Sequence, residues 1–206
     1  EIKRARRMVR SELAHILRLS FATVSGIIED LKRQGFVTIG EEGVSTGGRK
    51  PKSVEFLPES RLVVALDFSV KDKLHVSLVT LAYEILNDVW IEVGSANSCE
   101  GLFETVQDTY ELLINRSQVE RSAVIGAGVA VPGRYDETAD RIYFCTNALF
   151  EGISIRRRLE DRLQMPVSVM NDANLAALGH CTLLVRQDVN FFLLYFTEGI
   201  GLGIIH

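Results

Sequence analysis

The sequence predicts an α/β protein in two parts: an N-terminal winged helix-turn-helix followed by a lobe with the actin-like ATPase, or ribonuclease-H-like, fold. Three observations support this prediction. Two short amphipathic helices precede a glycine-rich hairpin, buried strands and amphipathic helices then alternate, and the charge changes sign between the two parts. We expect the first domain over residues 1–57 and the second over residues 61–206, joined by the short linker 57–60.

Two short helices with a tight turn between them are expected in the first domain. Ser11 can cap a helix that runs to Arg18, and Ser20 can cap a second helix from Phe21 to about Gln34, which Gly35 would end. Glycine is common in such turns, so with Arg18 there we expect the turn to do without a positive φ. The residues expected on the apolar faces are Leu13, Ile16 and Leu17, and then Val24, Ile27, Ile28 and Leu31.

A hairpin follows the second helix. Residues 36–39 and 53–56 are expected to be its strands, and the segment between them is rich in glycine and basic residues, as in the wing of a winged helix. The second helix would enter the major groove of DNA, and the wing would reach the backbone or a minor groove. The candidate DNA-binding residues are Ser20, Phe21, Thr23, Ser25, Lys32, Arg33, Arg49 and Lys50. A winged helix used for protein contact or dimerisation is the alternative.

The charge distribution agrees with a DNA-binding head. Residues 1–53 hold eleven Lys and Arg against six Asp and Glu, whereas residues 54–206 hold twelve against twenty-one. A basic head on an acidic body predicts a polyanionic partner for the head alone. Chance clustering would give the same charges.

The second domain shows alternating strand and helix patterns. Its strands are expected at 61–68, 73–80, 84–93, 123–131, 166–170 and 191–196, the first three as a meander. Its helices are expected at 101–115, 153–163 and 174–183, and a glycine-rich turn at 199–203. This order describes half of an actin-like ATPase fold.

Composition limits the location and the class of protein. At 47% hydrophobic and 24% charged residues, the 206-residue chain is globular rather than disordered. No apolar run reaches the roughly 18 residues of a membrane helix, and no signal peptide opens the chain. Cys99, Cys145 and Cys181 have no metal-like spacing, which suits a reducing compartment. We therefore expect a cytoplasmic protein that does not enter a membrane.

Three segments resemble one family. Residues 45–51 (STGGRKP) look like a repressor wing, residues 128–133 (GVAVPG) like a family strand and turn, and residues 171–179 (NDANLAALG) like the family's Asn-Asp-Ala-Asn segment. With these motifs the chain resembles the ROK family (repressor, open reading frame, kinase), in its transcription-factor branch.

This resemblance implies a sugar pocket between two lobes. Asn171 and Asp172 would bind sugar hydroxyls, because a carboxylate accepts hydrogen bonds and an amide both donates and accepts them. Asn147 matches a further sugar-contacting Asn, and Gly133 and Arg134 match positions that line the pocket. The alternative is that Asn171 and Asp172 only cap the next helix.

The same resemblance argues against catalysis. Family kinases carry Asp-x-Gly-Gly-Thr after the first strand and Gly-Thr-Gly-Ile-Gly in a second phosphate loop, whereas this chain has residues 67–71 (DFSVK) and 197–201 (TEGIG). Glycines let backbone N–H groups crowd a phosphate, and Glu198 would repel one. We expect no catalytic residue. The zinc site of relatives would lie only in a continuation beyond His206, so no cofactor is expected within this chain.

The sequence thus predicts a sugar-responsive transcriptional regulator, a repressor of carbohydrate-metabolism genes. The expected partners are double-stranded operator DNA, a sugar or sugar phosphate, and further copies of the chain in a homodimer or larger homo-oligomer. Two alternatives remain open: an ATP-dependent sugar kinase, and a module that binds DNA or a partner constitutively, without an effector.

Overall fold

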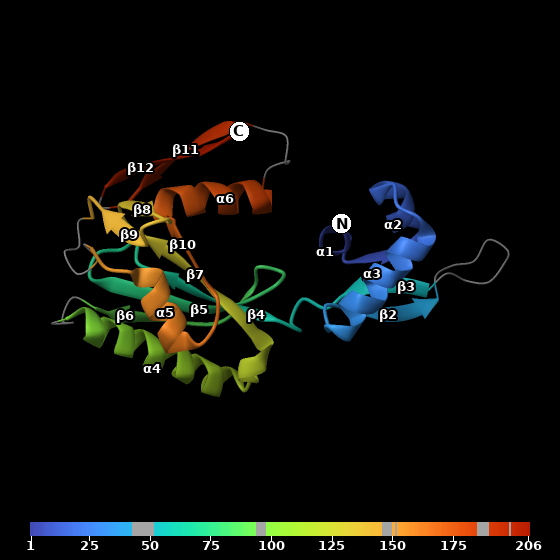
Figure 1. Ribbon diagram of the computed structural model, residues 1–206, viewed down its shortest axis with the longest axis horizontal. Helices are drawn as coiled ribbons and strands as arrows, with labels where there is room; N and C mark the ends of the chain where they lie inside the picture. Colours follow the sequence, from blue (N-terminus) through green and yellow to red (C-terminus); the bar gives the residue numbers. More distant parts are fainter. Residues whose placement is uncertain (43–51, 94–97, 146–149, 151, 185–189, 198) are drawn as a thin grey trace. The chain divides into compact units, whose positions relative to one another are not determined.

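The structure is a computed structural model that describes residues 1–42, 52–93, 98–145, 150, 152–184, 190–197 and 199–206. The chain forms two compact units (Figure 1). Unit 1 comprises Glu1–Arg61 with Thr80–Glu84, and unit 2 comprises Leu62–Val79 with Ile85–His206. No helix in these described ranges is long and apolar enough to cross a membrane.

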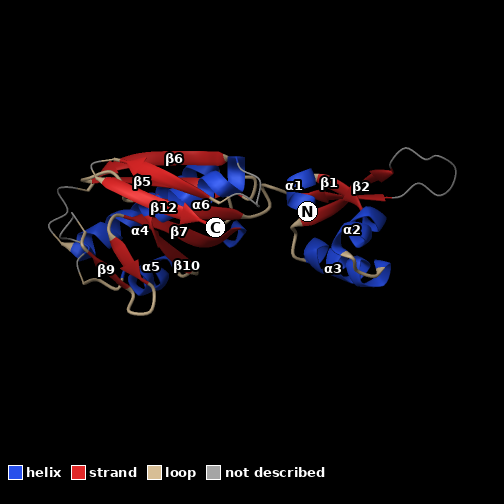
Figure 2. Cartoon of the chain, turned by 90° about the horizontal axis from the view of Figure 1, so that it is seen from above, coloured by secondary structure: helices blue, strands red, loops and turns tan. Residues whose placement is uncertain are grey.

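Unit 1 consists of short helices and a three-stranded antiparallel sheet, ordered β1-β3-β2 (Figure 2). The strand β1 and the helix α1 were not predicted from the sequence. The elements are α1 (Ile2–Ala5), β1 (Arg7–Val9), α2 (Arg10–Leu17), α3 (Phe21–Arg33), β2 (Val37–Glu42) and β3 (Lys52–Phe56).

The second helix of the predicted pair begins as expected and the first does not. The Ser20 side chain caps α3 by accepting a 3.0 Å hydrogen bond from Thr23 N, which confirms the predicted cap. The predicted Ser11 cap is wrong, because α2 starts at Arg10 and Val9 precedes it without a side-chain hydrogen bond. Arg18 corrects a further expectation: it takes a left-handed conformation with φ 52°, so the turn does use positive φ without glycine.

The core of unit 1 is smaller than the apolar patterns suggested. Ile16 and Leu17 on α2 and Ile27 on α3 are exposed, although we expected them on the apolar faces. A unit of this size has too little interior to cover every apolar side chain. Its buried core is Met8, Leu13, Val24, Ile28, Val37 and Val54.

Unit 2 is built on a mixed five-stranded sheet ordered β10-β7-β4-β5-β6. β7 pairs in parallel with both β10 and β4, and β5 pairs antiparallel with β6. The expected strands at its centre are therefore present. Their bounds are β4 (Leu62–Asp67), β5 (Lys73–Thr80), β6 (Ile85–Glu92), β7 (Val124–Val131) and β10 (Val167–Asn171).

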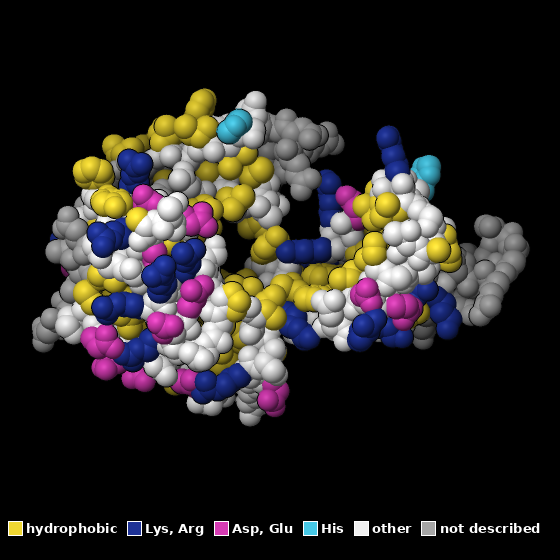
Figure 3. Space-filling model, in the orientation of Figure 1, with side chains coloured by type: hydrophobic (Ala, Val, Ile, Leu, Met, Phe, Trp, Pro, Cys, Tyr) yellow, Lys and Arg dark blue, Asp and Glu magenta, His cyan; other side chains and the backbone are white. Residues whose placement is uncertain are grey.

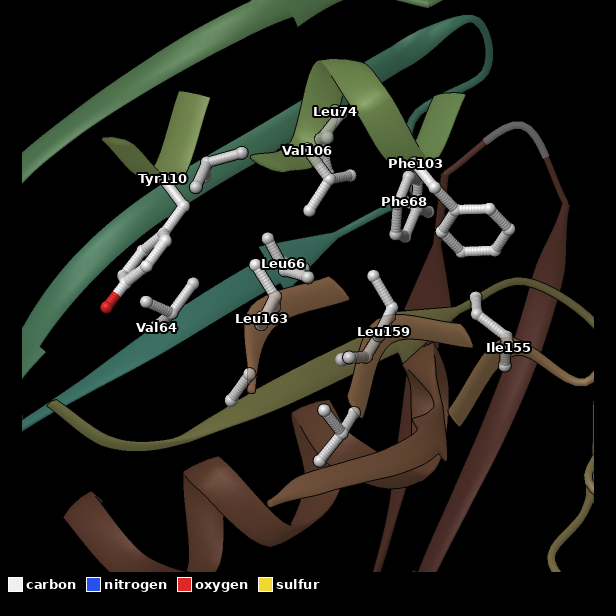
Figure 4. Packing of buried hydrophobic residues seen from close by; sticks show 14 of the residues in the cluster. Val64, Leu66, Phe68, Leu74, Phe103, Val106, Tyr110, Ile155, Leu159 and Leu163 are labelled. Atoms are coloured by element: carbon white, nitrogen blue, oxygen red, sulfur yellow. The ribbon is translucent and has the colours of Figure 1, made fainter. Parts of the chain in front are cut away.

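Helices α4 (Cys99–Ser117) and α5 (Ile155–Leu163) pack on the sheet and form the main core. All six apolar positions predicted for the first of these helices are buried, at the three- and four-residue spacing of one helix face. Figure 4 shows side chains of both helices gathered around β4, with Tyr110 near Val64, Leu163 near Leu66 and Phe103 near Phe68.

The end of the chain corrects one prediction. The glycine-rich stretch 199–203 was expected to be a turn, but most of it lies in strand β12 (Ile200–Ile205), which pairs antiparallel with β11 (Phe191–Phe196). The helix α6 (Asp172–Leu184) packs against both strands, and the glycines of β12 lie against it. A Cβ atom on Gly201 would lie 2.6 Å from Ala173 Cβ, and one on Gly203 would lie 2.5 Å from Ala173 O. The glycines therefore permit close approach of helix and strand.

The opposite side of β11 and β12 carries apolar side chains. Phe192, Leu194 and Phe196 on β11 are exposed, and so are Ile200, Leu202 and Ile204 on β12. Figure 3 shows hydrophobic side chains gathered over these strands, near the top of the view.

Candidate functional site

A cavity of about 270 Å³ lies in unit 2 where three parallel strands end. β4 ends at Asp67, β7 at Val131 and β10 at Asn171, and ligands of open α/β sheets bind at such carboxyl ends. The lining comes from the turns after these strands, the start of α6 and the hairpin β11–β12. The residues used below are Phe68, Ser69, Gly133, Phe144, Phe150, Asn171, Asp172 and Tyr195.

Asn171 fixes the start of α6 and joins it to the turn after β7. Its Oδ1 accepts a 3.1 Å hydrogen bond from Asn174 N, which is a helix cap. Its Nδ2 donates to Gly133 O at 2.7 Å and to Asp172 Oδ1 at 2.9 Å. Asn171 therefore caps α6, and its hydrogen bonds also hold the neighbouring carboxylate in place.

Asp172 presents a half-buried carboxylate to the cavity. Its Oδ1 accepts from Ala173 N at 2.8 Å as well as from Asn171. Burial raises the pKa of Asp172 above its usual value, and the negative charge of Asp67 raises it further, against the lowering effect of the hydrogen bonds. Such a carboxylate can accept hydrogen bonds from ligand hydroxyls while it is ionised.

Gly133 is required by the backbone at this site. Its φ is +84°, and a Cβ atom there would lie 2.8 Å from Tyr143 O and 3.1 Å from Cys145 Cα. Only glycine allows the turn after β7 to approach the segment 143–145 this closely. Gly133 thus lines the cavity.

The other predicted sugar-binding residues are placed differently. Arg134 is exposed and lines an adjoining hollow of about 460 Å³, which also touches Gly133 and Asn171. Asn147 lies outside the described residues. Of the five predicted residues, Gly133, Asn171 and Asp172 line the main cavity.

The turn after β4 is closed on itself. Asp67 Oδ1 accepts from Ser69 N at 2.8 Å and also from Ser69 Oγ. This part of the backbone therefore presents its N–H group to Asp67 rather than to a phosphate. Val70 and Lys71, which follow in the same turn, line the cavity as well.

A buried carboxylate anchors the hairpin of β8 (Arg134–Asp136) and β9 (Arg141–Tyr143), which was not predicted. Asp140, only 2% exposed, accepts from Arg156 N at 3.0 Å and Arg157 N at 3.1 Å, so it caps α5. It also accepts from Tyr135 OH at 3.0 Å. Burial and this hydrogen bond raise the pKa of Tyr135 to about 12.

Five of the eight predicted DNA-binding residues lie near the two ends of α3. Ser20 and Thr23 share a 2.8 Å hydrogen bond between their hydroxyls at its exposed start, and Phe21 beside them is 58% exposed. Ser25 differs, because its Oγ is buried without a hydrogen-bond partner among the described residues. Lys32 and Arg33 are exposed at the other end.

Charge pairs restrict some of the basic residues of unit 1. Arg33 forms an ion pair with Asp30 one turn earlier, and Arg10 of α2 forms one with Glu29 of α3 at 2.6 Å. Exposed pairs of this kind contribute little to stability and can exchange for other anions. Arg49 and Lys50 lie outside the described residues.

Sequence reasoning missed the aromatic lining of the cavity, which consists of Phe68, Phe144, Phe150 and Tyr195. Position along the chain gave no signal for these residues, since they come from four separate segments. Across the described ranges, no group of three or more His, Cys, Asp and Glu side chains is arranged to hold a metal ion.

Comparison with known proteins places this arrangement in one family. The sequence profile of the ROK family matches residues 64–206. The xylose repressor of Bacillus subtilis is 27% identical over 197 residues, which cover 95% of this chain and 50% of that protein. The chain thus spans about half the length of the curated relatives it matches.

Two further matches differ in how much of the chain they cover. A crystal structure of a ROK family transcriptional regulator, a homologue of the E. coli MLC protein, superposes with a TM-score of 0.78 at 17% identity and covers 96% of this chain and 50% of its own. The glucokinase of Halalkalibacterium halodurans is 26% identical over 133 residues, which cover 64% of this chain and 40% of the enzyme.

Proposed function

This chain belongs to the ROK family, and from that membership we propose that it is a sugar-responsive transcriptional repressor. The observation that carries the proposal is the extent of the matches. The match to a xylose repressor covers 95% of the chain, whereas the match to a glucokinase covers 64%. The resemblance to regulators therefore includes most of the basic unit 1.

The proposed DNA-binding element is a winged helix-turn-helix made of α2, α3 and the strands β2 and β3. Support comes from the turn at Arg18, from the capped and exposed start of α3, and from the antiparallel pairing of the two strands. In this proposal Phe21 and Thr23 face base edges, while Lys32 and Arg33 contact phosphate. Arg49 and Lys50 would contribute from the wing.

The proposed effector site is the cavity beside Asp172. A half-buried carboxylate next to apolar rings suits a ligand that has both hydroxyls and C–H surfaces. Xylose is the first sugar to test because it is named in several relatives. Binding would shift DNA affinity only if one arrangement of the repressor binds the sugar more tightly than another does.

A kinase is the alternative that a specific comparison favours, since ROK glucokinases are among the relatives. The turn after β4 argues against it, because Ser69 N and Oγ are both engaged by Asp67. Phosphoryl transfer depends on preorganised groups directed at the phosphates. We therefore propose that Asp172 binds sugar without acting as a base.

The partners proposed for the whole protein are a pseudo-palindromic operator and further copies of the chain. Repressors that read such operators bind as dimers whose symmetry matches the two half-sites. As a DNA-binding regulator it would act in the cytoplasm. The third candidate, a module that binds DNA without responding to any effector, differs from this proposal only in the absence of a sugar response.

The test is selection from a random duplex pool, followed by gel-shift titration of the winning duplex with and without D-xylose. We expect an enriched sequence whose apparent Kd changes when xylose is added. Equal affinity for every duplex would contradict DNA recognition, and an enriched duplex without any response to a pentose and hexose panel would favour the constitutive module. Formation of ADP from ATP and a sugar would favour the kinase.

A further inference from the structure

Phe144 is the unusual residue of the cavity. Its side chain is 87% exposed although it lines the cavity with Asn171 and Asp172. The other rings of the lining are covered to different degrees: Phe68 and Phe150 are buried and pack edge to face at 5.0 Å, and Tyr195 is partly buried. Among the four aromatic side chains that line the cavity, Phe144 alone is exposed to solvent.

The backbone of Phe144 is also strained. Its φ is 55°, in the left-handed region that glycine and asparagine adopt more readily than a bulky aromatic residue. Backbone strain of this kind is concentrated at functional sites, where surrounding structure maintains it. Here the surrounding structure is the turn after β7, since a Cβ atom on Gly133 would lie 3.1 Å from Phe144 O.

Neither folding nor backbone geometry explains a phenylalanine at this position. A glycine or an asparagine would relieve the strain, and the exposed ring buries little apolar surface. Gly133 O, however, accepts the hydrogen bond from Asn171 Nδ2, so the segment that holds Phe144 rests on the turn that positions the polar groups of the cavity. The backbone of Phe144 and the side chains of Asn171 and Asp172 are thus both positioned by the turn at Gly133.

We propose that Phe144 is the aromatic platform against which the apolar face of a sugar ring stacks while its hydroxyls bind Asp172. This inference rests on the proposed function. A sugar ring has C–H groups on its faces and hydroxyls on its rim, so one ring and one carboxylate recognise complementary parts of it. Burial of the exposed ring upon binding supplies affinity that hydroxyl contacts, which compete with water, do not.

The test measures sugar affinity of the full chain by titration calorimetry with D-xylose and D-glucose. We expect Phe144→Ala to weaken binding roughly tenfold, Phe144→Leu to weaken it less, and Phe144→Trp to bind within about threefold of the wild type. The matched control is Phe192→Ala, which removes a 73% exposed ring of β11 that does not line the cavity. The control should bind sugar like the wild type.

A fluorescence measurement separates stacking of the sugar on the side chain at position 144 from a general disruption of the cavity. The chain has a single tryptophan, Trp90, so Phe144→Trp in a Trp90→Phe background places the only indole at the cavity. We expect its emission to change as sugar saturates the site. In the same samples, each variant should unfold in urea with a cooperative transition like that of the wild type, which shows that unit 2 is folded.

The outcomes distinguish the two proposals. If the wild type binds sugar and Phe144→Ala binds it equally tightly, the platform is wrong and the proposed function stands. If Phe144→Ala changes the oligomeric state and leaves sugar affinity unchanged, the ring is a protein contact and the platform is again wrong. If the wild type binds no sugar of the pentose and hexose panel, the proposed function and this inference fail together.

Discussion

The start of α3 in unit 1 and the starts of α5 and α6 in unit 2 differ in how far along the chain their contacts reach. In unit 1, α3 is capped by Ser20, which directly precedes the helix and accepts a hydrogen bond from Thr23 N, three residues later. In unit 2, α5 is capped by Asp140, sixteen residues before Arg156, and α6 is tied through Asn171 to Gly133, thirty-eight residues earlier. The cap at Ser20 depends on neighbouring residues alone, whereas the contacts of Asp140 and Asn171 join segments that lie far apart in the sequence.

The largest effect is expected from Gly203→Ala, which disturbs a contact between two distant segments of unit 2. A Cβ atom there would meet Ala177 Cβ and Ala173 O, so α6 would have to leave β12. We expect a loss of about 3 kcal/mol in the free energy of unfolding, together with loss of sugar binding. Chemical denaturation measures the first effect and calorimetric titration the second. Gly179→Ala is the control, because nothing lies within 4 Å of a Cβ atom at that position of α6 and it does not line the cavity; an equal loss there would contradict the packing argument.

The next effect is expected from Asp140→Ala. It removes an almost fully buried acceptor and leaves Tyr135 OH and two backbone N–H groups without their partner. We expect a loss of roughly 2–3 kcal/mol, seen as a lower urea midpoint. Tyr135→Phe should cost only about 1 kcal/mol because it removes one hydrogen bond. If both variants cost the same, Asp140 does not cap α5.

Alkaline titration tests the same hydrogen bond. The pKa of Tyr135 is raised to about 12 in the folded protein, above the ordinary value of 10.0. A raised pKa means that the folded state favours the protonated phenol, so this stabilisation is complete below pH 10 and is lost as the pH rises toward 12. The stability difference between the wild type and Tyr135→Phe should therefore shrink over that interval. A constant difference would contradict burial of the hydroxyl.

A smaller effect is expected in unit 1 from Ser20→Ala. Loss of the side-chain acceptor should cost about 1 kcal/mol, measured as reduced stability of unit 1 by hydrogen exchange of the α3 amides. Ser11→Ala is the matched control, since Ser11 lies inside α2 and caps nothing. Equal effects of the two substitutions would show that the cap at Ser20 is unimportant.

The smallest effect has the opposite sign. Burial and Asp67 raise the pKa of Asp172, so its ionisation at neutral pH opposes folding. Asp172→Asn should therefore raise the melting temperature slightly at pH 7, by less than Ser20→Ala lowers it. The gain should grow as the pH rises from the ordinary carboxyl pKa through the raised one, and then level off. A destabilised variant at pH 7 would contradict this account.

The sequence predicted contacts between neighbours and missed those that join distant segments. The cap at Ser20, the buried face of α4 and the central strands follow from spacing within a few residues. The cap at Asp140 does not, because its partners lie sixteen and seventeen residues away. The glycines of β12 predict a turn when only neighbouring residues are considered. The structure uses them instead for the close approach of α6, which is a contact between segments far apart in the sequence.

The candidate site shows the same limit. The family resemblance gave Gly133, Asn171 and Asp172, which line one cavity, but it did not separate the capping role of Asn171 from a binding role. Phe144 left no pattern in the sequence, since exposure and positive φ emerge only when the turn after β7 meets the segment 143–145.

The most direct test of the account is one titration of the selected duplex at rising D-xylose concentration, carried out with the wild type and with Asp172→Ala. We expect both proteins to bind the duplex equally well without sugar, and only the wild type to change its apparent Kd as xylose is added. An Asp172→Ala protein that still responds to xylose would show that the sugar acts elsewhere, and that result would contradict the assignment of this cavity.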